Sequence, residues 1–335
     1  MNSKVSNTDG LRRIRTYPST PNGFDPNKAS PKELMQYGLP QRPDPEKQPE
    51  LARIWKRVFA RPIKVVEAEH AVDSVISVNH PRKEDSPDPG AFTSGWIGWA
   101  GVFKRMIKGS DFSNPATMVF GQLQLPNVEI VQPNKDVCLW VGLDGAPGGI
   151  IAPEAASQLL RACVTGQNRV ITRQGVTHEI DLWNAWVEWG TTDAAGSYLD
   201  LNIPMARGDL IAFLICVPQP DFASVWIANL TQGIGQSVGF PAPAGVTSQG
   251  QSAEWIVEVQ DPDMQAPDNP IPFFSPVTFT DCTAGSLQNG IFHLTDGITT
   301  NIVGTINGGP ATAAYTETVI ASPTVAVVED LMIDW

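Results

Sequence analysis

Long apolar segments are missing from this chain of 335 residues. No run approaches the roughly 20 consecutive apolar residues that an α-helix needs to cross a bilayer. The first residues, MNSKVSNTDGLRRIRTYPST, also lack the apolar stretch of a secretory signal peptide. These absences exclude a membrane-spanning protein. They predict a protein that stays in the cytoplasm or is exported by a route that needs no signal peptide.

Cysteine and histidine are scarce, with four of each. The cysteines lie far apart and show no paired spacing, which excludes a disulfide-dense scaffold and a zinc ribbon. They are Cys138, Cys163, Cys216 and Cys282. No two histidines have a spacing typical of metal ligands. We therefore expect reduced thiols with a structural role, and neither a metal nor another cofactor.

Basic residues are scarce beyond residue 90. Residues 1–90 hold 15 of the 23 Lys and Arg but only 12 of the 35 Asp and Glu, so this part carries about +3 and the remainder about −15. Nucleic-acid binding depends largely on Lys and Arg that displace counterions from phosphates, so an acidic body argues against a polynucleotide partner. The asymmetry also allows the basic part to lie along the acidic body, with a solvated tail as the alternative.

Composition divides the chain near residue 90. Residues 1–90 form a proline-rich leader, partly helical and partly extended, that is a possible prosegment. Its last ten residues, 81–90, are rich in charge and proline and are expected to form an exposed linker. Val, Ile, Thr, Trp, Phe and Gly dominate after it, which predicts a separate domain over residues 91–335.

The leader contains two helix signals. Ser30, Pro31 and Glu33 supply a cap residue, a first-turn proline and a glutamate three positions after the cap, and Gly38 ends this short helix. A second helix is predicted over residues 49–59, where apolar residues recur at helical spacing opposite a basic side. An apolar stripe of this kind has to bury against another part of the protein.

The domain that follows has a period of two rather than 3.6. In AEWIVEV, Trp255 and Val257 point to one side while Glu254 and Glu258 point to the other, which indicates a half-buried strand. Many short strands of this type, bounded by turn residues and without long helices between them, predict an all-β fold. The leading architecture is an antiparallel β-sandwich.

Three of the predicted strands place Trp or Glu opposite an aliphatic face. The segment DLWNAWVEW carries Trp186 and Glu188 on that side, VCLWVG carries Trp140, and AEWIVEV carries Glu258. If these strands are neighbours, they form a Trp-lined groove that bears carboxylates. The alternative is that the indoles belong to a second core, although a buried unpaired carboxylate would be costly there.

Seven segments within about residues 96–285 resemble, in order, the landmarks of the glutamic peptidases, or eqolisins. They are GWAGVF, LWVGLDG, LLRACV, NAWVEW, ANLTQGIGQS, AEWIVEV and FFSPVTFTDC. The resemblance implies a concanavalin-like sandwich of two curved antiparallel sheets with a substrate cleft on the concave face. It also implies an endopeptidase that acts on polypeptides in acid through a glutamate and a glutamine. The chain resembles a bacterial-type member whose leader takes the place of the prosegment.

The resemblance places the catalytic glutamate at Glu258, which the strand alternation independently points away from the core. The glutamine does not match, because Arg161 stands at its position in Leu-Leu-Arg-Ala-Cys. Gln174 is the alternative if the inserted segment 146–182 folds differently. Further cleft or near-cleft positions implied by the resemblance are Trp99, Trp140, Asp144 and Glu188, and the strand alternation adds Trp186 as a substrate-binding candidate.

Replacing the glutamine affects the chemistry. Metal-free peptide hydrolysis needs a base to activate water, a donor to hold the oxyanion and an acid to protonate the leaving amine. Arg161 could serve as the oxyanion donor, but an ion pair with Glu258 would make that glutamate a poor proton donor. Two functions therefore remain open: a glutamic endopeptidase, or a catalytically silent sandwich that binds peptide or glycan in the Trp-lined groove.

Two further expectations concern other parts of the chain. Residues 235–239, GQSVG, match the nucleophile elbow of serine hydrolases, but the FPAPAG that follows is incompatible with the helix that this motif requires. The basic leader, with its amphipathic helix, is expected to cover the groove and to loosen in acid. The alternative is that the helix docks permanently on the other side of the sandwich.

Overall fold

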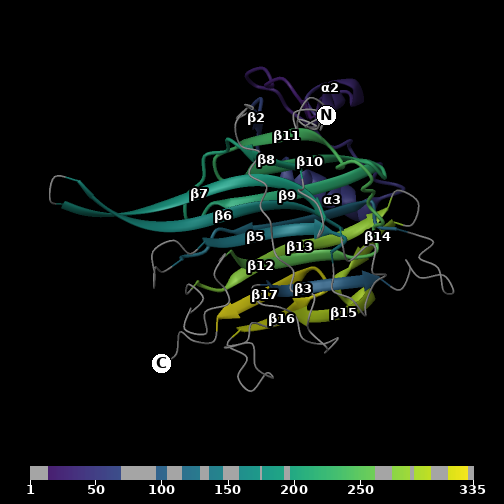
Figure 1. Cartoon of the computed structure of the whole chain (residues 1–335). Coiled ribbons are helices and arrows are strands. Elements are labelled where there is room, and N and C mark those ends of the chain that lie inside the picture. The colour runs from purple at the N-terminus through teal and green to yellow at the C-terminus, as the bar shows by residue number, and fades with distance from the viewer. Residues whose placement is uncertain are drawn as a thin grey trace, which may run out of the picture.

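Two β-sheets form the body of the protein in a computed structural model (Figure 1). The structure describes residues 14–68, 96–103, 115–128, 136–145, 158–173, 176–191, 197–260, 274–286, 290–302 and 316–330. Pairing is antiparallel throughout these residues except between β2 and β11, so the predicted all-β sandwich of two antiparallel sheets is confirmed. No helix in the described ranges is long and apolar enough to cross a membrane.

The larger sheet has ten strands, in the order β1-β11-β10-β9-β4-β13-β17-β16, with β2 paired to β11 and β14 to β13. Their bounds are β1 (Arg15–Thr16), β2 (Lys64–Val65), β4 (Met118–Gln124), β9 (Leu210–Gln219), β10 (Phe222–Asn229), β11 (Ile234–Pro241), β13 (Val277–Ser286), β14 (Gly290–His293), β16 (Thr316–Ser322) and β17 (Val325–Asp330).

The smaller sheet has seven strands, in the order β15-β3-β12-β5-β6-β7-β8. Their bounds are β3 (Trp96–Phe103), β5 (Asp136–Leu143), β6 (Gln158–Arg173), β7 (Val176–Thr191), β8 (Ser197–Leu201), β12 (Ala253–Gln260) and β15 (Gly297–Ile302), and a short 3-10 helix, η2 (Leu294–Asp296), precedes β15. Figure 1 shows the hairpin of β6 and β7 projecting far beyond the other strands. This hairpin accounts for most of the inserted segment.

The main core lies between the sheets and follows the predicted alternation. Trp255 and Val257 of β12 are fully buried there, together with Val141 of β5 and Phe213 of β9. Glu254 and Glu258, the alternate residues of β12, are not part of this core. Side chains alternate between the faces of a strand, so one face of the seven-stranded sheet is left for polar groups.

The first leader helix is α2 (Pro31–Gln36), and it forms where the sequence predicts it. The Ser30 hydroxyl accepts a hydrogen bond from the Glu33 backbone N–H at 3.2 Å, and the Glu33 carboxylate accepts one from the Ser30 backbone N–H at 2.7 Å. This reciprocal cap satisfies two backbone donors that the first turn leaves free. Gly38 follows the helix with a φ of +66°, a left-handed conformation that glycine adopts without strain.

The second leader helix, α3 (Pro49–Val58), packs on the ten-stranded sheet, on the face opposite the main core. Its Trp55 stacks against Phe59, with ring centroids 4.2 Å apart, and Phe59 lies 5.5 Å from Trp226 of β10. Phe120 and Leu214 belong to the same cluster. The prediction that this helix covers the Trp-lined groove is therefore wrong. The apolar residues of the helix are buried instead against apolar residues on the outer face of the ten-stranded sheet.

Charged contacts join the same helix to the end of the ten-stranded sheet. Arg57 forms an ion pair with Asp281 of β13, and the Glu50 carboxylate lies 3.1 Å from Nε2 of His293 on β14. Electrostatic attraction between the leader and the acidic body thus exists, but on the face away from the groove. The predicted linker at residues 81–90 lies outside the described residues.

Candidate active site

Five of the predicted site residues lie on the face of the seven-stranded sheet that points away from the core: Trp140, Arg161, Trp186, Glu188 and Glu258. Arg161 and Glu188 are direct cross-strand partners on β6 and β7. Glu258 lies on β12, and β5 runs between it and Arg161. The strand order therefore brings together residues that are far apart in the sequence.

Arg161 is the centre of this cluster and is only 1% exposed. Its Nε donates to Oε2 of Glu188 at 2.8 Å, and Nη2 lies 2.7 Å from the same oxygen. Its Nη1 donates to Oε2 of Glu258. One guanidinium thus connects both carboxylates, which makes their burial energetically tolerable.

Two indoles hold the guanidinium in place. The centre of the Arg161 guanidinium lies 5.5 Å from the Trp140 ring and 4.8 Å from the Trp186 ring, within the range of cation–π attraction. Trp140 also donates from Nε1 to Oε2 of Glu258 at 3.0 Å, and Trp186 donates to the Thr165 hydroxyl at 2.7 Å. The indoles are therefore both packed and hydrogen-bonded, rather than lining an open groove.

The two oxygens of Glu258 have different surroundings. Oε2 accepts from Trp140 and from Arg161, and the side chain as a whole is 9% exposed. Within the described part of the chain, Oε1 makes none of the hydrogen bonds of this residue. Glu258 is therefore buried and held through Oε2, and Oε1 is the oxygen that takes no part in these two bonds.

Charge pairing and burial set the protonation states around Arg161. Burial alone would lower the pKa of Arg161, but the carboxylates of Glu258 and Glu188 raise it well above its ordinary value. Burial also raises the pKa of the Cys163 thiol, and a hydrogen bond with Cys138 adds to this effect. The guanidinium stays charged and the thiol stays neutral, so Cys163 is not an activated nucleophile.

Asp144 lies at the end of β5 and has a different set of partners. It has a φ of +64°, and its Oδ2 accepts from the Ser248 hydroxyl and the Gln249 backbone N–H, each at 2.9 Å. Its Oδ1 accepts from the Gln251 backbone N–H at 2.9 Å. Asp144 thus holds the segment between β11 and β12, and none of these contacts reaches Arg161.

Two predicted positions cannot be tied to the cluster. Trp99 of β3 pairs with Trp255, which faces the core, whereas Trp96 pairs with Glu258. The side chain of Trp99 lies outside the described residues, and so does Gln174. Their roles in substrate binding and catalysis stay predictions.

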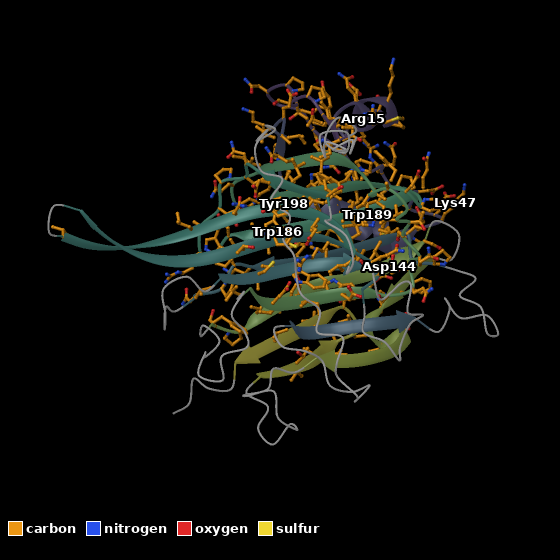
Figure 2. All side chains as sticks on the ribbon, in the orientation of Figure 1. Arg15, Lys47, Asp144, Trp186, Trp189 and Tyr198 are labelled. Atoms are coloured by element: carbon orange, nitrogen blue, oxygen red, sulfur yellow. The ribbon has the colours of Figure 1, made fainter. Side chains whose placement is uncertain are left out.

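Three residues beside the cluster were not singled out in the sequence. Asp200 on β8 pairs with Trp186, and its Oδ1 accepts from the Asn184 amide and the Tyr198 hydroxyl, each at 2.7 Å. Figure 2 shows Trp186 and Tyr198 close together, and their ring centroids are 5.2 Å apart. The alternation of SYLDL could have indicated that Tyr198 and Asp200 share one face.

Other candidate sites lie away from these residues. Ser237 of the G-x-S-x-G match lies within β11 and is 1% exposed, so no nucleophile elbow forms.

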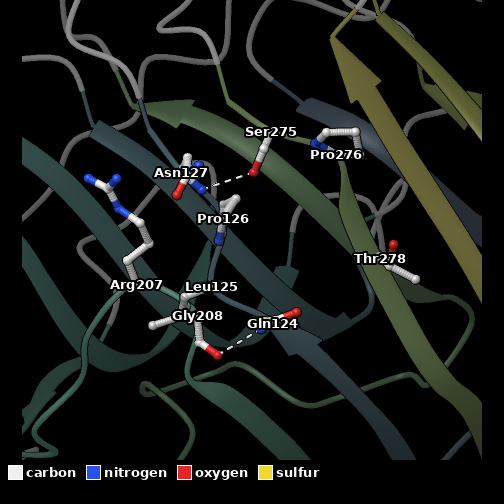
Figure 3. A pocket seen from close by; sticks show the side chains of 9 residues that line it. All are labelled: Gln124, Leu125, Pro126, Asn127, Arg207, Gly208, Ser275, Pro276 and Thr278. Atoms are coloured by element: carbon white, nitrogen blue, oxygen red, sulfur yellow. Dashed lines mark hydrogen bonds between the residues drawn. The ribbon is translucent and has the colours of Figure 1, made fainter.

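A pocket of ≈ 260 Å³ lies where β4 ends and β9 and β13 begin (Figure 3). Its walls are joined by a bond of 3.0 Å from Gln124 to the Gly208 carbonyl, and it contains none of the predicted site residues. No group of three or more potential metal ligands occurs among the described residues.

Comparison with known proteins shows the family and agrees with the fold. The sequence profile of the Peptidase A4 family matches residues 97–328. The structure is similar to scytalido-glutamic peptidase bound to a transition-state analogue inhibitor, with a TM-score of 0.50 and 19% identity over 71% of this chain and 98% of that one.

Two other solved structures show weaker similarity. SCP-B, a member of the eqolisin family in complex with the tripeptide Ala-Ile-His, has a TM-score of 0.49 and 19% identity over 71% of this chain and 98% of its own. Aspergilloglutamic peptidase from Aspergillus niger has a TM-score of 0.41 and 24% identity over 58% and 98%, respectively. Among curated proteins, no sequence matches this chain.

Proposed function

Because the chain belongs to the Peptidase A4 family, we propose that it is a glutamic endopeptidase that cleaves polypeptides in acid, with Arg161 at the position of the family's glutamine. The observation that carries the proposal is the environment of Glu258. Trp140 and Arg161 bind its Oε2, and Oε1 is free of those contacts. A carboxylate held in this way can take a proton from a water molecule on the Oε1 side.

The proposed reaction uses two residues. Oε1 of Glu258 takes a proton from water as the water oxygen attacks the carbonyl carbon, and the negative charge that develops on the carbonyl oxygen is stabilised by Arg161. Glu258 then gives the proton to the amide nitrogen as the C–N bond breaks.

A second function is favoured by one specific observation. Three nitrogens of Arg161 are already bound by carboxylates. A guanidinium that is engaged in this way has few donors to offer a developing oxyanion. The second candidate is therefore a catalytically silent member of the family that binds peptide or glycan on the same face.

Incubation of the full chain with a denatured protein between pH 2 and pH 7 separates the two functions. The peptidase predicts cleavage in acid that Glu258→Gln lowers at least about a hundredfold, as expected for loss of a general base. The matched control is Asp221→Asn, which changes an exposed carboxylate between β9 and β10 on the other sheet. A lack of cleavage by the folded chain at every pH, with measurable peptide or glycan binding, would support the silent member instead.

A further inference from the structure

Asp200 is a carboxylate at the edge of the candidate active site. It lies on β8, the last strand of the seven-stranded sheet, directly across from Trp186. Asn184 and Tyr198 both donate to Oδ1, which fixes the carboxylate between two neutral groups. In the described part of the chain, Oδ2 takes part in neither bond. The residue is half-buried, so Oδ2 can reach a bound molecule.

No cation of the described residues forms an ion pair with Asp200. The guanidinium of Arg161 lies on the same face, but Glu188 and Glu258 bind it. The donors that Asp200 does have are an amide and a phenol, and neither neutralises its charge. Asp200 therefore retains an attraction for a cation supplied from outside the chain.

An aromatic surface adjoins this carboxylate. The rings of Trp186 and Tyr198 are tilted at 34° to one another with centroids 5.2 Å apart. Trp186 is fixed by its bond to Thr165 and by the adjacent Arg161. Aromatic faces of this kind pack against the aliphatic stem of a Lys or Arg side chain and attract its charge.

Tyr198 stays a hydrogen-bond donor over the whole working range of pH. Burial raises the pKa of its phenol well above the ordinary value, and the hydrogen bond to Asp200 raises it further. The phenol is consequently a hydrogen-bond donor at acidic and at neutral pH. Asp200 is thus held in one orientation whether the medium is acidic or neutral.

We propose that Asp200, Tyr198 and Trp186 form a subsite that accepts a Lys or Arg side chain of a polypeptide lying across this face. The proposal rests on the proposed function and narrows it to substrates with a basic residue near the cleaved or contacted bond. The carboxylate binds the cationic head, and the half-buried ring of Tyr198, supported by the buried Trp186, packs against the aliphatic stem. Asn184 acts as a positioning residue that fixes Asp200, whereas Tyr198 both fixes Asp200 and lies against the bound side chain.

The test compares two sets of peptides, in which each position in turn carries either Lys or norleucine, its uncharged analogue of similar length. Binding is measured with the full chain carrying Glu258→Gln, and cleavage is measured with the unchanged chain. At one position we expect Lys to be preferred about tenfold, the size of one charge-assisted hydrogen bond. The preference should shrink with added salt.

Three variants test whether Asp200 is responsible for the preference for Lys. Asp200→Asn should abolish the preference for Lys over norleucine. Tyr198→Phe should reduce the preference only partly, because Asp200 keeps its charge and loses one of its two positioning bonds. Asp221→Asn should change nothing, since this exposed carboxylate lies on the other sheet. A general loss of negative charge would affect both Asp variants equally.

The outcomes are distinguishable. Cleavage or binding without a Lys preference, or a preference that survives Asp200→Asn, overturns the subsite and leaves the peptidase intact. A Lys preference in binding that Asp200→Asn removes, without any cleavage, supports the subsite and overturns the peptidase. If the folded chain neither binds nor cleaves peptides of either set, both proposals are wrong.

Discussion

The indole of Trp140 lies over Gly142, two residues further along β5. A methyl group added at Gly142 would come within 2.7 Å of Cζ3 of Trp140 and 3.2 Å of Oε2 of Glu254. Glycine is therefore required here by the close approach of the ring rather than by its backbone freedom. This approach places Nε1 of Trp140 against Glu258.

Gly142→Ala should displace the Trp140 ring and destabilise the fold by about 1–3 kcal/mol, the cost of overfilling a packed site. Urea denaturation measures the loss, and a shift of tryptophan fluorescence reports the ring. Gly190→Ala is the control on the same sheet, because its nearest atom would lie at 3.5 Å, an ordinary contact. It should change stability by less than about 1 kcal/mol, and equal losses in the two variants would contradict the assignment of Trp140 as the obstacle.

Arg161→Gln should raise the rate of peptide cleavage in acid by about tenfold or more. The substitution supplies a neutral oxyanion donor and removes the cation that is bound to Oε2 of Glu258. The same variant should lose about 3 kcal/mol of stability at neutral pH, since both carboxylates lose their buried partner. Cleavage rates and thermal denaturation are measured on the same preparation. Unchanged or lower activity in a folded variant would mean that Arg161 does not occupy the position of the family's glutamine. Gln174 would then be the next residue to test for that role.

Asp144→Ala should destabilise the protein by about 3 kcal/mol, because it leaves one buried and one part-buried backbone N–H group without an acceptor. Burial raises the pKa of Asp144 above its ordinary value of 3.8, and its hydrogen bonds offset this only in part. A carboxyl group whose pKa is raised in the folded state stabilises that state most when it is protonated. Its contribution to the free energy of unfolding is therefore complete below pH 3.8 and falls as the pH rises. The cost of the variant should therefore be larger at pH 3.5 than at pH 7.5.

Denaturation of the unchanged protein and the variant at both pH values gives the difference directly. Asp221→Ala, which removes an exposed carboxylate, should show no such dependence. A cost of Asp144→Ala that grows toward neutral pH would mean that its hydrogen bonds outweigh its burial.

Trp55→Ala should cost about 3–5 kcal/mol, as expected for truncating a large buried aromatic side chain. The helix that carries it covers the outer face of the ten-stranded sheet, and Phe59, whose ring centroid lies 4.2 Å from that of Trp55, would be left beside a cavity. Met35→Ala in α2 is the control, because the Met35 side chain is 60% exposed and its truncation should cost less than about 0.5 kcal/mol.

Removing residues 1–68 should unfold or aggregate the body. A stable, soluble body without them would restore the idea of a removable prosegment.

The sequence alone was sufficient where one segment determines the outcome. The alternation of AEWIVEV predicts that Trp255 faces the core and Glu258 does not, because neighbouring side chains of a strand point to opposite faces. The cap at Ser30 and Glu33 likewise predicts α2, since its hydrogen bonds join residues three apart. Each of these is a property of a few consecutive residues.

Tertiary structure decided what each local element contacts. The apolar stripe of α3 requires burial but does not identify the surface, and the free apolar face happened to be that of the ten-stranded sheet. The register of β5, β6 and β12 carries the Arg161 side chain past Trp140 to Glu258, although 97 residues separate the two partners. The same pairing across β7 and β8 put Asp200 beside Trp186. These contacts depend on strand order and register, which no local pattern of side chains specifies.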